Sequence, residues 1–357
     1  MKQLQLRYLF IALALGASLA SCRKDKNEPT DTFETPDVLI LSQGNIGKNN
    51  SLVSSYNFTS NNLVTDAFSA VNGRGIGDTG NDIKQYGSKI YIVVNYSSTV
   101  EVIASRSLKS LKQVPLMNGA TPRQPRSIAF YQNKAYVSSY DGTVAVIDTA
   151  SLTVDKFINV GRNPEQLAVA NGKLYVANSG GLDYPNVDNT VSVINLNTGT
   201  LVKTITVGDN PYGVAVDKGG DVYVSAYGVY YGPEDPLNTS ASLAVINSAT
   251  DEVKTKNDFF GSNFTISGNF GYYLNWDSTI SVYDTDKEVV IKDNLISDGT
   301  TFKAAYNLTV ADNGEFFVTD AKDYSSDGEL FIFDSSGKKR HTLTTGINPS
   351  AVLIVKK

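Results

Sequence analysis

Internal repetition constrains this chain more than any other feature of its sequence. Residues 125–161, 164–208 and 211–255 are three versions of one pattern. Each version holds four short runs rich in Val, Ile, Tyr and Thr, and Gly, Asn and Asp separate the runs. Short β-branched and aromatic runs between such turn residues predict strands joined by tight connections. One copy is therefore expected to be one four-stranded antiparallel meander.

Weaker copies can be aligned on a marker position in the second strand. Aromatic residues recur there at spacings of roughly 40 to 50 residues, namely Tyr91, Tyr136, Tyr175, Tyr223, Tyr273 and Phe317. The two ends of the chain supply a seventh copy: residues 349–355 as its first strand, and 38–41, 52–58 and 63–68 as its second, third and fourth. Pairing the ends covers edges that would otherwise invite aggregation.

The sequence therefore predicts an all-β fold, a seven-bladed β-propeller of four-stranded antiparallel blades over residues 37–357. A C-terminal strand that pairs with the N-terminal blade would close the ring. A β-helix is the alternative architecture for a chain of short repeated strands.

The first 36 residues predict export. Lys2 and Arg7 flank the start of an uncharged run that extends to Ala20. That run of roughly 13 residues covers about 20 Å as a helix, which is shorter than the ~30 Å hydrocarbon core of a membrane. We therefore expect residues 1–21 to be a signal peptide that is removed, and residues 22–36 to be a polar, disordered tether.

The end of the signal peptide, Leu19-Ala20-Ser21-Cys22, resembles the lipobox of bacterial lipoproteins. The resemblance implies that Cys22 becomes the first residue and carries a lipid. An ordinary signal-peptide cysteine is the alternative. Cys22 is the only cysteine, so no internal disulfide can form. The expected location is the outer membrane at the cell surface, although Arg23, Lys24 and Lys26 depart from the acidic stretch common in surface-displayed lipoproteins.

Charge and histidine content limit the function classes. Removal of residues 1–21 leaves 29 Lys and Arg against 36 Asp and Glu, a net charge of about −7, which argues against nucleic acid as a partner. His341, the only histidine, is expected in the last outer strand. No histidine is then expected on a loop face. This argues against histidine zinc sites, histidine-ligated haem and Ser-His or Cys-His catalytic arrangements there. We therefore expect that the chain is not an enzyme. A calcium-dependent lactonase or lyase that uses carboxylates is the alternative.

The loops between second and third strands are long and unlike one another, at residues 179–189, 226–240 and 321–328. Because strands alternate in direction, these loops and the links between blades share one face. Long ordered loops on a rigid scaffold are common places for binding sites. Aromatic residues gather in these loops and after the blade-opening prolines: Tyr96, Tyr140, Tyr184, Tyr227, Tyr230, Tyr231, Trp276 and Tyr324, with Arg126, Glu165, Tyr212, Phe264 and Tyr306.

Polar residues on the same face supply candidate hydrogen bonds, and the ligand-binding set we predict is Asn45, Asn95, Tyr96, Arg126, Tyr140, Asn178, Tyr184, Tyr212, Tyr227, Tyr230, Tyr231, Trp276, Asp320 and Tyr324. The alternatives are that the tyrosines pack between blades and that the polar residues cap turns. Two acidic groups, Asp183 with Asp188 and Asp323 with Asp327 and Glu329, offer oxygen ligands for Ca²⁺, but neither has a known loop spacing. We therefore assign no metal and no catalytic residue.

Motifs at residues 175–178, 190–195 and 207–211 resemble the YVTN family of propellers, also described as surface-layer or YncE-like proteins. The lipid anchor, the ring and the aromatic face together are similar to the cobalamin-capturing surface lipoproteins of the Bacteroidetes (BtuG). That resemblance implies a bound corrinoid as ligand, no separate cofactor, and delivery to an outer-membrane transporter. A surface propeller that binds a glycan or a protein is the alternative.

Overall fold

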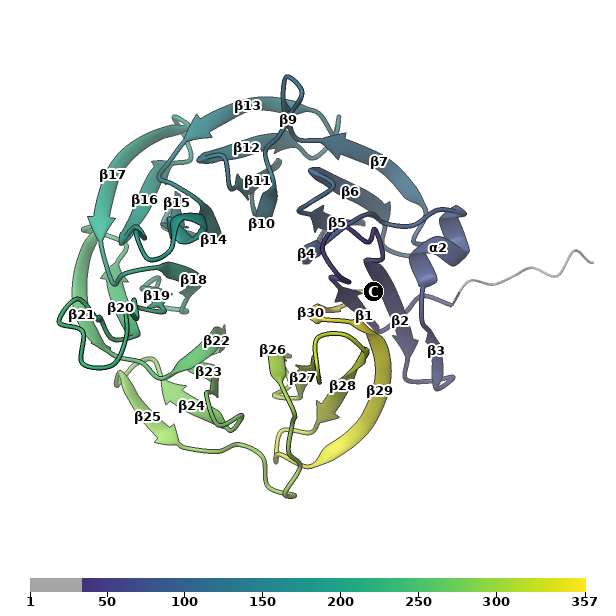
Figure 1. The fold of residues 1–357 in the computed structure, drawn as a ribbon. Coiled ribbons are helices and arrows are strands. Elements are labelled where there is room, and N and C mark those ends of the chain that lie inside the picture. The colour runs from purple at the N-terminus through teal and green to yellow at the C-terminus, as the bar shows by residue number, and fades with distance from the viewer. Residues whose placement is uncertain (1–33) are drawn as a thin grey trace, which may run out of the picture. The chain divides into compact units, whose positions relative to one another are not determined.

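The computed structural model describes residues 34–357, which form a ring of seven four-stranded antiparallel sheets (Figure 1). Each sheet is one blade, with its first strand beside the centre of the ring and its fourth strand at the rim. The predicted β-propeller is confirmed. The predicted signal peptide, Cys22 and the tether up to residue 33 lie outside the described residues. Within residues 34–357, no helix is long and apolar enough to cross a membrane.

Blades 2 to 7 each use four consecutive strands. From the centre outward these are β4 (Gly80–Tyr86), β5 (Lys89–Val94), β6 (Thr99–Ala104) and β7 (Ser110–Pro115); β10 (Pro125–Tyr131), β11 (Lys134–Ser139), β12 (Thr143–Asp148) and β13 (Val154–Asn159); β14 (Pro164–Ala170), β15 (Lys173–Asn178), β16 (Thr190–Asn195) and β17 (Thr200–Thr206); β18 (Pro211–Val216), β19 (Val222–Ala226), β20 (Ser242–Asn247) and β21 (Glu252–Asp258); β22 (Gly261–Ser267), β23 (Phe270–Asn275), β24 (Ile280–Asp284) and β25 (Val289–Lys292); and β26 (Ala305–Val310), β27 (Phe316–Asp320), β28 (Asp327–Phe333) and β29 (Lys339–Ile347).

Blade 1 joins the two ends of the propeller. Its strands from the centre outward are β30 (Pro349–Ile354), β1 (Val38–Ser42), β2 (Leu52–Asn57) and β3 (Asn62–Val64). β1 pairs antiparallel with β2 on one side and with β30 on the other. The predicted closure is confirmed, because the C-terminal strand is hydrogen-bonded into the N-terminal blade.

The predicted fourth strand at residues 63–68 is only half right. β3 ends at Val64, and a short helix, α2 (Ala67–Asn72), follows it. The side chain of Asp66 accepts a hydrogen bond from the backbone N–H of Ser69, which caps the start of the helix. Gly73 ends the helix in the left-handed conformation, at φ 65°. The link between blades 1 and 2 is therefore helical. Two smaller elements, the hairpin β8 (Met117–Asn118) with β9 (Thr121–Pro122) and the 3₁₀ turn η1 (Gly181–Asp183), lie in other connections.

The hydrophobic core is divided into seven clusters, and each lies between two neighbouring blades. The marker tyrosines belong to these clusters: Tyr91 is fully buried between blades 2 and 3, and Tyr175 between blades 4 and 5. β30 serves two of them, since Val352 packs with blade 7 and Leu353 packs against the cluster shared with blade 2. Closure of the ring thus completes two hydrophobic contacts at once.

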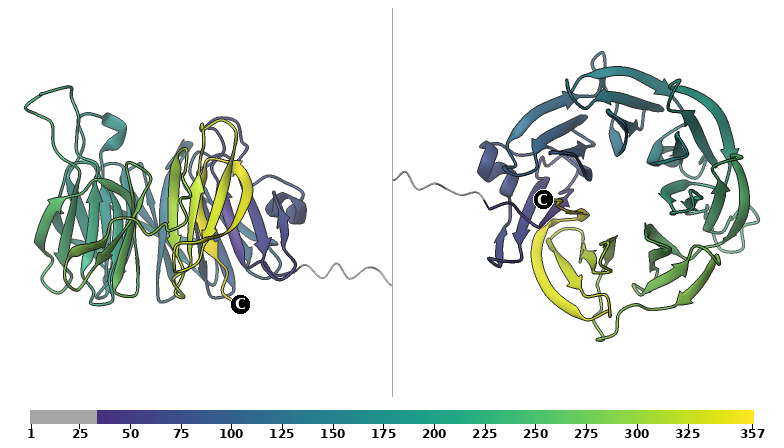
Figure 2. Two further views of the ribbon diagram at one scale, coloured as in Figure 1. Left: turned by 90° about the horizontal axis from the view of Figure 1, so that it is seen from below. Right: turned by 180° about the vertical axis from the view of Figure 1, so that it is seen from behind.

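The alternation of strands gives the ring two faces. We call the side with the second-to-third-strand loops and the links between blades the loop face, and the opposite side the turn face. In Figure 2, left, the connections of blades 4 and 5, coloured teal and green, extend beyond the rest of the ring on one side, and the C-terminus lies on the other. His341 lies in β29, the outer strand of blade 7, where the sequence predicts it.

Candidate functional site

The mouth of the central channel on the loop face is set by one position in each inner strand. In every blade the first residue of the inner strand pairs with the end of the second strand, as Pro125 does with Ser139. The residue after it therefore takes an equivalent place in all seven blades. We call these the mouth residues: Asn81, Arg126, Glu165, Tyr212, Ser262, Tyr306 and Ser350.

One predicted member of this ring is wrong. Phe264 is buried between blades 5 and 6, packed against Tyr223 and Tyr273, and does not lie at the mouth. Ser262 has that position, because Gly261 opens the strand and pairs with Asn275. Blade 6 has no blade-opening proline, so nothing in its sequence marks the start of this strand.

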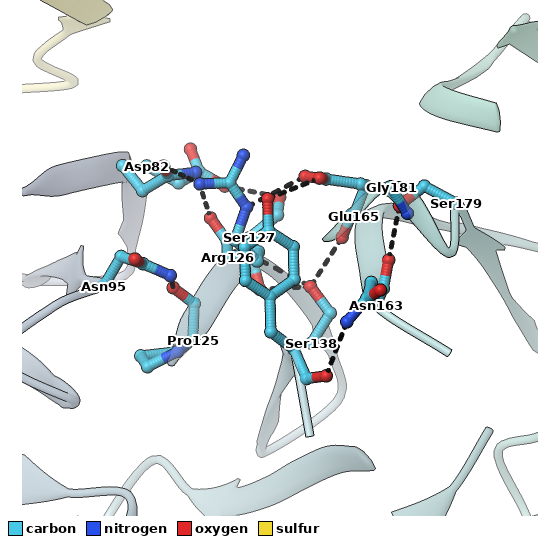
Figure 3. Close-up of polar contacts among 12 residues, drawn as sticks. Asp82, Asn95, Pro125, Arg126, Ser127, Ser138, Asn163, Glu165, Ser179 and Gly181 are labelled. Carbon is cyan, nitrogen blue, oxygen red and sulfur yellow. Dashed lines mark hydrogen bonds and ion pairs between the residues drawn. The ribbon is translucent and has the colours of Figure 1, made fainter. Parts of the chain in front are cut away.

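Blades 2 to 4 contribute the charged half of the mouth, which we define as Asn81, Arg126, Tyr140 and Glu165. Figure 3 shows Arg126 and Glu165 with their polar contacts. Nε of Arg126 donates to Oε2 of Glu165 at 2.9 Å, and Nη1 donates to the side-chain oxygen of Asn81. The phenol of Tyr140 donates to the other oxygen of Glu165 at 2.7 Å. The guanidinium also lies over the Tyr140 ring, 4.7 Å from its centroid. Three blades are thus joined by one hydrogen-bonded row.

Blades 5 to 7 contribute the aromatic half, which we define as Tyr212, Tyr227, Trp276, Tyr306 and Tyr324. Tyr212 and Tyr227 stack with ring centroids 3.7 Å apart, and Trp276 follows at 6.3 Å from Tyr227. Tyr306 and Tyr324 meet edge to face, with centroids 6.0 Å apart. Trp276 remains 59% exposed. These rings leave broad apolar surface open to solvent, which suits contact with a flat ligand.

The two halves line one opening, because their inner-strand residues Arg126, Glu165, Tyr212 and Tyr306 take equivalent positions around the ring. Burial raises the pKa of Tyr227 to about 12, Glu165 and Tyr306 add to the rise, and Arg126 opposes it. Burial likewise raises the pKa values of Tyr140, Tyr212 and Tyr306. Burial alone would lower the pKa of Arg126, but Glu165, Tyr140 and Tyr306 together outweigh it and the pKa is raised. At neutral pH the phenols are therefore uncharged hydrogen-bonding groups and Arg126 is a cation.

A protruding pair of loops borders the aromatic half, and we call it the tyrosine wall: residues 179–189 of blade 4 and 227–241 of blade 5. The phenol of Tyr184 accepts from the backbone N–H of Tyr230 at 2.8 Å and donates to its carbonyl at 2.9 Å. Tyr230 itself is 62% exposed. A cavity of about 300 Å³ lies between the loops, and Tyr184, Tyr227 and Tyr230 help to line it. The Tyr184 phenol thus ties the two loops together through the backbone of Tyr230, and the ring of Tyr230 remains available.

Below the mouth, the channel contains an open cavity of about 520 Å³. Its lining comes from the inner strands of blades 2 to 7 and mixes apolar side chains with Asp82, Lys84, Gln166, Asn263 and Asn307. The carboxylate of Asp82 accepts from the hydroxyl of Ser127 at 2.7 Å. The channel therefore continues the polar character of the mouth.

Several predicted polar residues are used inside the fold instead. Asn178 is fully buried, and its side chain bonds the backbone of Gly161 and the hydroxyls of Thr190 and Ser192. Asp320 is buried and accepts backbone N–H groups from residues 303, 304 and 322. We therefore leave both out of the candidate site.

Two further predicted asparagines differ in exposure. Asn95 is buried, and its side chain donates to the carbonyl of Pro125 at 3.0 Å, which ties blade 2 to blade 3. Asn45 lies in an exposed loop, where its side chain donates to the carbonyl of Tyr324. Tyr96 is 51% exposed in the short loop of blade 2. Asn45 and Tyr96 thus lie on the loop face, and Asn95 lies beneath it.

Sequence reasoning missed Asn81 and Gln43. Asn81 follows Gly80, where no proline marks the blade opening, and its partner Arg126 comes from the next blade. Gln43 accepts a hydrogen bond from the Tyr306 phenol at 3.0 Å, across a sequence separation that spans most of the chain. The repeat alignment could have found Asn81 by its position, whereas nothing local indicates Gln43.

The acidic groups that offered calcium ligands are occupied by protein partners. Asp183 and Asp188 pair with Arg162 at 3.2 and 2.6 Å. Asp323 accepts backbone N–H groups of Ser325 and Ser326 in its own turn. In the part of the chain that the structure describes, no cluster of three or more His, Cys, Asp or Glu side chains is arranged to hold a metal.

Solved structures similar to this chain include a quinonprotein alcohol dehydrogenase-like protein from Bacteroides thetaiotaomicron, with a TM-score of 0.65 and 15% identity over 90% of this chain and 79% of that one. Hydrazine synthase from Kuenenia stuttgartiensis matches with a TM-score of 0.58 and 16% identity, over 74% of this chain and 85% of that one. The computationally designed Ika8 protein matches with a TM-score of 0.57 and 15% identity, over 87% and 88%. At these identities the likeness shows the fold alone.

No curated protein matches this chain. A family model does: the one described as "Domain of unknown function (DUF5074)" matches residues 37–283, well over half of the chain. The match begins just before β1 in blade 1 and ends within β24 in blade 6. The chain therefore belongs to the DUF5074 family.

Proposed function

We propose that this chain is a binding protein that holds a small molecule at the loop-face mouth of its propeller. One observation carries the proposal: the mouth has a charged half fixed by Arg126 and Glu165, and an aromatic half led by Tyr227 and Trp276. Such a surface offers a flat contact area next to oriented hydrogen-bonding groups, the combination common in ligand sites.

The same residues favour binding over catalysis. Arg126 and Glu165 form an ion pair, and the mouth phenols have raised pKa values, so none of these phenols is a base poised near neutral pH. His341 lies in the outer strand β29, where it packs against Tyr56 and Phe58. Turnover of any compound in a lactone panel with added Ca²⁺ would contradict this part of the proposal.

A corrinoid, with cobalamin as the first candidate, is the ligand we test first. The resemblance to cobalamin-capturing lipoproteins suggests it, and a broad macrocycle with amide side chains suits aromatic rings beside hydrogen-bond donors. The full-length chain in mild detergent should co-elute with cyanocobalamin, and the red colour reports binding directly. The Tyr227→Ala variant should lose the colour while its melting temperature changes little. A colourless wild-type protein at saturating cyanocobalamin would remove the corrinoid assignment.

A glycan is the second candidate, and the exposure of Trp276 and Tyr96 favours it. Exposed aromatic rings also form platforms for the apolar faces of sugars. A glycan array and the cyanocobalamin assay, run on the same preparation, would separate the two ligand classes.

We also propose that the protein is lipid-anchored at the outer membrane and displayed at the cell surface, where it passes its ligand to a transporter. The proposal rests on the lipobox-like sequence that ends at Cys22. Cys22→Ala should abolish labelling by a fatty-acid probe and release the protein from the membrane fraction. Proteolysis of intact cells tests display, and affinity purification from membranes tests for the transporter. Unchanged labelling would defeat the anchor.

A further inference from the structure

Arg126 is the one cation in the charged half of the mouth, and the structure fixes it in place. Its Nε atom donates to Glu165, its Nη1 atom donates to Asn81, and its guanidinium lies over the ring of Tyr140. The side chain is 21% exposed. A guanidinium held on three sides loses little conformational entropy when a ligand binds to its remaining side.

The groups around Arg126 in the described part of the chain leave one of its donors without a partner. Both oxygens of Glu165 already accept hydrogen bonds, one from Tyr140 and one from Arg126. The side-chain oxygen and nitrogen of Asn81 are both engaged with Arg126. Within residues 34–357, Nη2 of Arg126 forms no hydrogen bond or ion pair. The charged half thus offers N–H groups and no vacant carboxylate oxygen.

This donor and the aromatic half serve the same opening. Arg126 takes the mouth position of blade 3, Tyr212 takes that of blade 5, and Tyr212 stacks on Tyr227. A ligand whose flat part contacts Tyr227 and Trp276 can therefore extend across the mouth toward Arg126. An acceptor on the ligand that meets a guanidinium makes a charge-assisted hydrogen bond, which is about twice as strong as a neutral one.

We propose that Arg126 is the specificity-determining residue of the mouth, and that it selects ligands in which an oxygen acceptor, best a carboxylate or phosphate, lies next to a planar group. This inference rests on the proposed function and narrows its ligand class. Asn81, Tyr140 and Glu165 act as positioning residues, because they hold the guanidinium without meeting the ligand themselves.

Trp276 makes a direct test possible, since it is the only tryptophan of the chain and belongs to the aromatic half. Three nitroaromatic quenchers share one ring and differ in charge: 4-nitrobenzoate, 4-nitrobenzamide and 4-nitrobenzylamine. Titrated into the full-length chain in mild detergent, the carboxylate should quench Trp276 with about tenfold higher affinity than the amide, and the amine should bind weakest. Added salt should weaken the binding of 4-nitrobenzoate and leave the binding of 4-nitrobenzamide nearly unchanged.

Variants locate the selectivity. Arg126→Gln should make the affinities of the three probes similar, while 4-nitrobenzamide still quenches Trp276. Arg126→Lys should restore part of the preference for the carboxylate. Lys203→Gln removes one cation from the exposed rim strand β17 and should change nothing. If Arg126→Gln lowers the melting temperature strongly, Tyr140→Phe offers a second variant. It removes the hydrogen bond to one Glu165 oxygen and should selectively lower the affinity for 4-nitrobenzoate.

Each combination of results decides between the two proposals. Equal affinities of the three probes for the wild-type protein overturn the role of Arg126, and binding of cyanocobalamin in a parallel titration then leaves the proposed function standing. A carboxylate preference that depends on Arg126, without cyanocobalamin binding, supports the inference and removes the corrinoid. Absence of both signals defeats both proposals.

Discussion

The turn face and the loop face of this propeller are built on different rules. On the turn face, one device recurs in six blades: an Asn or Asp at the end of the third strand accepts backbone N–H groups two and three or four residues later, at Asn57, Asp148, Asn195, Asn247, Asp284 and Asp334. On the loop face, the loops between second and third strands range from the short loop 140–142 to the long loop 227–241, and the side chains that they place at the mouth differ from blade to blade.

This difference separates what makes the fold from what makes the site. A repeated turn serves a need that every blade shares, the tight reversal between its outer strands. Groups found once, such as the Arg126–Glu165 pair and the Tyr212–Tyr227 stack, serve no need common to the blades. Changes on the two faces should therefore affect different properties, stability in one case and binding in the other.

The largest expected effect comes from removing the strand that closes the ring. Truncation after residue 348 deletes β30, which exposes the edges of β1 and the hydrophobic clusters it shares with blades 2 and 7. We expect a loss of several kcal/mol, seen as a melting temperature many degrees lower or as aggregation. Calorimetry of the truncated and parent chains measures it. A truncated chain that melts like the parent would contradict ring closure.

Alkaline pH should destabilise the whole ring next most strongly. Burial raises the pKa of Tyr91 and of Tyr283 to about 12, from 10.0, and also raises the pKa values of Tyr175 and Tyr223. The unfolded chain therefore releases these protons first, so this contribution is complete below pH 10 and is lost as pH rises toward 12. Melting temperatures should be flat from about pH 7 to 9 and fall steeply above pH 10.

A matched variant tests the cause of that alkaline loss. The phenol of Tyr175 donates to the carboxylate of Asp251 at the turn face. Tyr175→Phe removes one titrating group and should lower stability at pH 7 but reduce the further loss above pH 10. An equally steep alkaline loss in the variant would assign the effect to other groups.

Removing the hydrogen-bond acceptor from one of these repeated turns should lower the stability only modestly. Asn195→Ala removes the acceptor for the N–H groups of Asn197 and Thr198, at 3.0 and 3.2 Å, and should cost about 1 kcal/mol. Asn195→Asp restores an acceptor, and because Asp serves at the equivalent position in three blades it should be nearly neutral. Denaturant titration of the three proteins compares them, and ligand affinity should stay constant throughout.

The smallest effect on stability should accompany the largest effect on binding. Tyr230→Ala with Tyr231→Ala removes two exposed rings of the tyrosine wall but keeps the backbone groups of Tyr230 that bond to Tyr184. We expect an unchanged melting curve and a loss of roughly 1 to 4 kcal/mol in binding if either ring is an anchor.

The control for this pair must lie on the other face and must have no partner of its own. Phe270, an exposed aromatic residue at the turn face, is suitable, and Phe270→Ala should change neither property. Lys173, although it follows a short turn, pairs with Asp251 at 2.7 Å and would disturb two blades. Equal binding by the wall variant, the control and the parent would argue against the aromatic mouth.

The fold could be predicted in detail because each blade repeats the same pattern, so weak copies could be aligned on strong ones such as residues 164–208. The helix at Ala67–Asn72 escaped prediction because it occurs once and its residues also fit a strand. Loop-face tyrosines could be placed by strand parity alone. Asn178 and Asp320 look like site residues in sequence, but burial and backbone partners decide their roles, and only the structure supplies those.

The entry point of the chain has a mechanical consequence. β1 starts at the turn face, where the N–H of Asp37 donates to Tyr56 and its carbonyl accepts from Val355. If the segment before residue 34 is anchored and a partner pulls from the loop face, the tension runs along β1 and loads its hydrogen bonds to β2 and to β30 together, in shear. The joint between the two ends of the chain then also sets how much force the protein withstands.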